Sequence, residues 1–271
     1  MASAPADQWA SGNAYEAYMG RWSRELGRAF IEWLAPMPGG HWLEVGCGTG
    51  ALTGTIAELA APTSLVACDP AEPFVAFARN HLDDARVSFA VANAASLPAR
   101  LDGFDMIVSG LVLNFVPEPE PALRGMVERL ASNGTVAAYV WDYAAGLEFL
   151  RHFWDEAVAR DPAAAQLDEG TRFPLCNPSA LGALFISAGL AGVETRPLEI
   201  ATEFRDFDDY WRPFLGGTGP APTYVASLDE VARAALRDAL ERRLAPAGGA
   251  LCLRARAWAV RGRARRDGRV A

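Results

Sequence analysis

From residue 41 onward the sequence alternates between short apolar runs and segments of helical periodicity. Apolar runs occur at 41–45, 64–69, 86–93, 103–113, 135–141, 192–200 and 250–260. Helical patterns separate most of them, and such alternation is typical of right-handed βαβ units and a parallel sheet. We predict a Rossmann-like, doubly wound α/β fold with seven strands, mostly parallel with an antiparallel last strand, and helical inserts that form a lid.

Two helix ends can be predicted from their local sequence. Asn177 and Pro178 have the residue types of an N-cap and a first helical position. A second pattern, with Leu123 and Leu130 among its apolar positions, is expected to stop at "SNG", where Gly134 would follow the helix.

The stretch "LEVGCGTG", Leu43–Gly50, places three alternate glycines after the first predicted strand. Bare backbone there allows a ligand to approach closely, and the following helix start favours an anionic group. Asp69 ends the second predicted strand, where a carboxylate can accept both hydroxyls of a ribose. The pattern indicates a nucleoside-type cofactor.

The spacing G-x-G-x-G differs from the dinucleotide fingerprint G-x-G-x-x-G. Together with "NAASLP" (93–98) and "DMIVSGLVLNFVP" (105–117), the stretch resembles class I S-adenosylmethionine-dependent methyltransferases of the small-molecule type, such as the ubiquinone/menaquinone-biosynthesis group. The resemblance covers about 41–142. It departs from the family at Asn93, where many relatives have aspartate.

The resemblance implies S-adenosyl-L-methionine as cofactor and an acceptor pocket over it. The implied cofactor-binding residues are Tyr18, Arg21, Glu44, Gly46, Cys47, Gly48, Gly50, Asp69, Pro70, Asn93, Ala94 and Ser109.

Three segments outside the glycine region are expected to cover the cofactor. These are a helical N-terminal segment, 1–40, and two inserts within the methyltransferase domain 41–271, at 143–176 and 203–249. Because the inserts follow parallel strands at their carboxyl ends, we expect them to form a lid and hold the acceptor. The predicted acceptor-binding residues are Asn114, Tyr143, Phe207, Tyr210 and Trp211, although core packing is the more common role of any single buried aromatic ring.

A general base is needed only where the acceptor must lose a proton. His152 lies in the first insert and Asp142 at the tip of the fifth predicted strand, so these two are the candidate catalytic residues. No metal is expected.

Composition excludes several classes of function. All 25 basic residues are arginine, so Schiff-base lysines and GK[ST] phosphate loops are impossible. A net charge of −8 disfavours bulk nucleic acid as a partner, and no run approaches the length of a membrane span. We expect a cytoplasmic enzyme, with four free and buried cysteines, that methylates a small, partly apolar organic molecule.

Two other functions stay open from the sequence. A nicotinamide-dependent oxidoreductase explains Asp69 equally well but fits the glycine spacing less well. A non-catalytic S-adenosylmethionine-binding protein would have the same motif. The acceptor, the methylated atom and the oligomeric state are not specified by the sequence.

Overall fold

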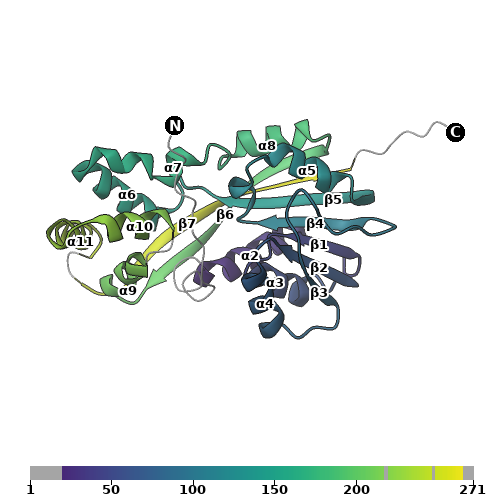
Figure 1. The fold of residues 1–271 in the computed structure, drawn as a ribbon, viewed down its shortest axis with the longest axis horizontal. Coiled ribbons are helices and arrows are strands. Elements are labelled where there is room, and N and C mark those ends of the chain that lie inside the picture. Colours follow the sequence, from purple (N-terminus) through teal and green to yellow (C-terminus); the bar gives the residue numbers. More distant parts are fainter. Residues whose placement is uncertain (1–19, 217–218, 246–247, 265–271) are drawn as a thin grey trace. The chain divides into compact units, whose positions relative to one another are not determined.

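The computed structural model describes residues 20–216, 219–245 and 248–264 (Figure 1). The chain divides into two compact units. Unit 2 comprises Ser23–Trp141, Leu175–Leu198 and the chain from Ala257 on, and unit 1 comprises Asp142–Pro174, Glu199–Arg256 and the chain up to Trp22. Unit 1 thus includes most of both predicted inserts.

The predicted seven-stranded sheet is confirmed, with strand order β3-β2-β1-β4-β5-β7-β6. Pairs among β1 to β5 are parallel, whereas β7 pairs antiparallel with β5. The strands are β1 His41–Val45, β2 Ser64–Asp69, β3 Val87–Val91, β4 Phe104–Gly110, β5 Leu130–Trp141, β6 Ala191–Phe204 and β7 Leu251–Arg263.

The strand order reverses between β1 and β4, since the chain builds β2 and β3 on one side of β1 and β4 on the other. Leu43 pairs with Ile107 across this reversal, and Val45 pairs with Cys68 on the β2 side. In open parallel sheets, ligands bind at the carboxyl ends of strands at such a reversal. The segment after β1 is therefore placed at the expected binding edge.

Helices flank the sheet of unit 2, as a doubly wound fold requires. In Figure 1, α2, α3 and α4 lie on one side and α5 and α8 on the other. Their bounds are α2 Arg21–Leu34, α3 Ala51–Leu59, α4 Glu72–His81, α5 Pro119–Val127 and α8 Pro178–Ser187, with a short 3-10 turn, η2, at Leu113–Phe115. The N-cap prediction is confirmed, because the Asn177 side chain accepts a hydrogen bond from Ala180 N.

The predicted helix end at "SNG" is wrong. Helix α5 ends at Val127 and β5 begins at Leu130. Pairing with β4 then passes from Leu130 directly to Thr135, so 131–134 form a bulge in which Asn133 has a φ of 68°. A Cβ on Gly134 would lie 2.8 Å from the Phe104 carbonyl oxygen. The glycine permits close strand approach instead of ending a helix.

Unit 1 is mainly helical and has an aromatic core. Its helices and 3-10 turns are α6 Glu148–Arg160, η3 Pro162–Gln166, α7 Glu169–Arg172, α9 Phe207–Trp211, η4 Arg212–Gly216, α10 Pro220–Ser227 and α11 Glu230–Leu244. The rings of Phe153 and Phe214 stack at 4.5 Å, and Tyr210 contacts both Phe204 and Phe214.

The two remaining features of the fold are the cysteines and the apolarity of the helices. Cys47, Cys68 and Cys176 are free and buried as expected, but Cys252 is exposed. Among the described helices, none has the length and apolarity needed to cross a membrane.

Candidate functional site

The turn after β1 is shaped by glycines in the left-handed region. Gly46 has a φ of 81°, and a Cβ there would lie 2.4 Å from Cγ2 of Val112, so a side chain has no room. Gly48 has a φ of 51°, but no described atom lies within 4 Å of its Cβ position. Gly50 is the N-cap residue of α3. Close packing thus requires the first glycine, whereas the second presents bare backbone to open space.

Asp69 holds this turn from the tip of β2. Its Oδ2 accepts a hydrogen bond from Gly48 N at 3.0 Å, and its Oδ1 accepts one from Ala71 N at 2.9 Å. Burial raises the pKa of the carboxyl group, while these two backbone bonds oppose the rise. Each carboxylate oxygen retains a lone pair for a further donor, as a ribose diol would provide. Pro70 follows and is exposed.

Glu44, in β1 just before the turn, is the second buried acid beside it and is 1% exposed. Its Oε2 accepts a hydrogen bond from Thr53 Oγ1 at 2.6 Å, which joins β1 to the first turn of α3. Burial raises the pKa of Glu44 to about 7. Thr53 was missed by the sequence analysis, and its position nine residues after the acid carries no motif signal.

Cys47 lies between the two acids in the glycine turn. Burial raises the pKa of its thiol, and the negative charges of Glu44 and Asp69 raise it further. Burial also raises the pKa of Cys68, to about 12. Thiols of this kind are poor nucleophiles at neutral pH. Cys47 therefore acts in this turn as a small buried side chain.

The loop after β3 contains Asn93 and Ala94. Asn93 is exposed, and its Oδ1 accepts a hydrogen bond from Ala95 N at 2.9 Å. The side chain therefore orders the loop as an Asx turn. Ala94 is half-buried. Their predicted contact with adenine stays a prediction.

The segment after β4 contains two predicted site residues in different environments. The Ser109 hydroxyl donates to the Val45 carbonyl oxygen at 2.9 Å and is buried, so it ties β4 to β1. Asn114 lies in η2, and both its amide atoms are buried without a hydrogen-bond partner in the described residues. Leu111, between them, has a φ of 61°. Unpaired buried amide atoms are costly, so Asn114 is suited to a ligand.

The other predicted residues belong to unit 1, except Tyr18, which lies outside the described residues. Arg21 donates to the Glu203 carbonyl oxygen at 2.8 Å and pairs with Asp209 at 3.3 Å. These contacts fix Arg21 to the end of β6 and to α9.

The two predicted bases differ in their environments. Asp142 is 4% exposed, and its Oδ2 accepts hydrogen bonds from Arg256 Nε at 2.8 Å and Nη2 at 2.7 Å. Both arginine nitrogens thus contact the one carboxylate oxygen, which is engaged in an ion pair instead of facing open space. His152 has a buried Nδ1 that lacks a partner among the described residues, and burial lowers its pKa. Of the two, His152 is better suited to accept a proton.

The predicted aromatic acceptor residues are all buried in unit 1. Tyr143, Phe207 and Trp211 are 4–6% exposed. The Tyr210 hydroxyl donates to the Phe149 carbonyl oxygen at 2.9 Å. These side chains form core contacts, and their role toward an acceptor stays a prediction.

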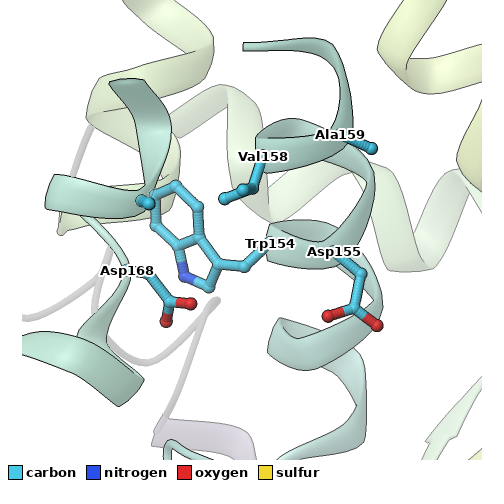
Figure 2. A pocket seen from close by; sticks show the side chains of 6 residues that line it. Trp154, Asp155, Val158, Ala159 and Asp168 are labelled. Atoms are coloured by element: carbon cyan, nitrogen blue, oxygen red, sulfur yellow. The ribbon is translucent and has the colours of Figure 1, made fainter. Parts of the chain in front are cut away.

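Unit 1 also has an open hollow of about 390 Å³ beside α6 (Figure 2). Trp154, Val158, Asp155 and Asp168 line it. Its acids already have partners, since Asp168 pairs with Arg151 at 2.5 Å and Asp155 pairs with an arginine of α11. The hollow therefore offers little unbalanced charge to a ligand.

A Rossmann-like sheet, a glycine turn at its strand-order reversal and an acid at the tip of β2 define a protein that binds a nucleoside-type cofactor. Residues 43–138 match a family model described as a methyltransferase domain. This part of the chain is thus similar to a methyltransferase domain, and the seven-stranded sheet has the Rossmann-like fold of class I methyltransferases. The match covers the glycine turn, both acids and Asn114.

Two curated relatives match part of the chain. A ubiquinone biosynthesis O-methyltransferase from Xanthomonas campestris is 33% identical over 103 residues, which are 37% of this chain and 42% of the relative. A ribosomal RNA small subunit methyltransferase H from Nostoc punctiforme is 34% identical over 110 residues, 40% of this chain and 37% of the relative. The chain spans less than half the length of either relative.

A solved structure extends the likeness in fold. The phosphoethanolamine N-methyltransferase 2 of Haemonchus contortus, in complex with S-adenosyl-L-methionine, has a TM-score of 0.57 at 14% identity. The alignment covers 94% of this chain and 58% of that one. The fold likeness therefore continues beyond the 43–138 match.

Proposed function

We propose that this protein transfers a methyl group from S-adenosylmethionine to a small, partly apolar organic acceptor. The observation that carries the proposal is the arrangement around Gly48. Its backbone faces open space, its N–H is held by Asp69, and Asp69 retains lone pairs for a ribose. A bare turn with an adjacent buried acid matches what the cofactor requires.

The residues of the turn have separate roles in this proposal. Asp69 accepts the ribose hydroxyls, and the backbone around Gly48 admits the cofactor without a steric clash. The bound cofactor supplies an electrophilic methyl group. Asn114 then offers a donor and an acceptor, both unpaired, that orient the bound molecules. Where the acceptor must lose a proton, His152 is the proposed base.

Two observations support a small organic molecule as the acceptor. A net charge of −8 opposes association with a polyanion, and one relative is named for ubiquinone biosynthesis. The ribosomal RNA relative keeps nucleic acid as the competing acceptor. We also propose that the inserts at 143–176 and 203–249 act as a lid and that the enzyme works in the cytoplasm.

Cofactor binding is tested with Asp69→Ala. Loss of charge-assisted hydrogen bonds should weaken S-adenosylmethionine binding by about 1–3 kcal/mol. Asp83→Ala is the matched control, because Asp83 is an exposed acid of the same unit. Calorimetric titration measures both variants. Equal affinity in the wild type and in Asp69→Ala would refute the ribose role.

Turnover decides the acceptor class. The protein is incubated with methyl-labelled S-adenosylmethionine and either a panel of small phenols, acids and amines or ribosomal RNA. Label transfer to a small molecule supports the proposal. Transfer only to RNA would replace it, and binding without any transfer would favour the non-catalytic alternative. Stabilisation by NADH, but not by S-adenosylhomocysteine, would favour the oxidoreductase.

A further inference from the structure

Glu44 is buried beside the glycine turn and has no basic hydrogen-bond partner among the described residues. Its Oε2 accepts a hydrogen bond from Thr53, whose hydroxyl is neutral. The strand continues from Glu44 through Val45 directly into the turn at Gly46. The carboxyl group of Glu44 therefore lies next to the glycine turn at which the cofactor is proposed to bind.

Within the part of the chain that the structure describes, the titratable groups that interact with Glu44 supply no positive charge. Asp69 on β2 is an acid, and Cys47 and Cys68 are thiols whose pKa burial raises, so they are neutral at pH 7. The hydrogen bond from Thr53 favours the ionised form of Glu44, but burial outweighs it and raises the pKa of Glu44 to about 7. A modest change in nearby charge is then sufficient to shift the proton equilibrium.

We propose that Glu44 lets the protein distinguish the charged cofactor from its neutral product by a linked proton. In this proposal a larger fraction of the carboxyl group is protonated near pH 7 with S-adenosylhomocysteine than with S-adenosylmethionine. Glu44 thereby determines specificity between cofactor and product. The proposal rests on cofactor binding at the glycine turn.

The charge difference between the two ligands provides the coupling. The sulfonium of S-adenosylmethionine carries one positive charge, which the thioether of the product lacks. A positive charge near the turn lowers the pKa of Glu44, so binding releases a proton to solvent. After methyl transfer that charge is gone, and the carboxylate takes up a proton from solvent. The product therefore lacks the electrostatic attraction to the Glu44 carboxylate that the sulfonium of S-adenosylmethionine has.

The sign of the pH dependence follows from this linkage. Below the pKa that Glu44 has in the ligand-free protein, binding of S-adenosylmethionine must remove a proton from Glu44. This cost weakens the affinity for S-adenosylmethionine. As the pH rises toward 7 this cost disappears and affinity increases. We expect the preference for S-adenosylmethionine over the product to rise about tenfold between pH of about 5.5 and about 7.5. Both ligands carry the same amino group, so its titration largely cancels in the ratio.

The experiment is calorimetric titration of the full chain with both ligands over this pH range, in two buffers of different ionisation enthalpy. The buffers report proton release directly, and about half a proton should be released per S-adenosylmethionine near pH 7. Glu44→Gln keeps the shape and an acceptor for Thr53 but cannot ionise. It should bind both ligands with a nearly pH-independent preference and without this release.

Thr53→Val provides a second test if Glu44→Gln folds poorly. The substitution removes a hydrogen bond that favours ionised Glu44. The pH at which the preference for S-adenosylmethionine rises should therefore increase by about one unit. An equal pH dependence in the wild type and Glu44→Gln would overturn the proposal, as would an unshifted midpoint in Thr53→Val. Failure of the wild type to bind either ligand would overturn the cofactor assignment itself.

Discussion

Gly46 and Gly48 occupy one turn but are constrained for different reasons, so alanine at each position should have different effects. Gly46 faces the methyl groups of Val112 at 2.4 and 2.7 Å from an added Cβ, whereas Gly48 faces open space. Gly46→Ala should mainly reduce stability. Gly48→Ala should mainly reduce cofactor affinity, because its methyl group occupies the space into which the ligand is expected to bind.

The magnitudes follow from two separate costs. A left-handed backbone costs a residue with a Cβ about 1–2 kcal/mol. Forcing an added methyl group against a packed neighbour costs about 1–3 kcal/mol. Gly46→Ala incurs both and should lose about 2–5 kcal/mol, whereas Gly48→Ala incurs only the first. Val112→Ala added to Gly46→Ala should recover most of the steric part and none of the backbone part.

Urea unfolding of the variants measures the free energy of unfolding, and calorimetric titration with S-adenosylhomocysteine measures binding. The reasoning is refuted if Gly46→Ala is no less stable than Gly48→Ala. It is also refuted if Val112→Ala fails to restore any stability to Gly46→Ala. Unchanged ligand affinity in a folded Gly48→Ala would show that the cofactor does not approach this backbone.

Three further predictions concern other parts of the molecule. Arg256→Met should destabilise the chain by about 3–5 kcal/mol, because Asp142 is left buried and unpaired, and urea unfolding would detect the loss. Trp211→Ala should lose about 3–5 kcal/mol of stability by truncating a core ring, while cofactor affinity measured on the same samples stays within a few tenths of a kcal/mol. A thiol reagent at pH about 8 should modify exposed Cys252 first, and Cys47 only on unfolding; early modification of Cys47 would contradict its burial.

The cofactor half of the fold was predictable because its signals are local. The bounds of β1 and β2 match the apolar runs 41–45 and 64–69, and the glycines lie in the turn that these bounds require. Asp69 was identified because the tip of a strand in a parallel sheet fixes where its side chain lies. Each of these inferences depends on residues close in sequence, where propensity and spacing suffice.

Contacts distant in sequence were not predictable. The bulge in β5 depends on close approach of Gly134 to Phe104 in another strand, and nothing in "SNG" distinguishes it from a helix end. Similarly, Asp142 is a plausible base by its place in the chain, but Arg256, 114 residues later, pairs with it. A residue type at the correct edge of a sheet predicts proximity to a site, whereas its partner determines what it can do there.

The glycine turn also couples cofactor binding to the stability of unit 2. Gly48 N donates to Asp69 and Thr53 donates to Glu44, so two carboxylates from neighbouring strands hold the turn before any ligand binds. Both acids are buried, and burial alone would favour protonation and weaken these bonds. A ligand that donates hydroxyls to Asp69 and places positive charge near Glu44 strengthens the ionised forms. Cofactor binding should therefore order the turn that receives it, and at equal free ligand concentration near pH of about 7.5 the increase in stability should be larger with S-adenosylmethionine than with its uncharged product.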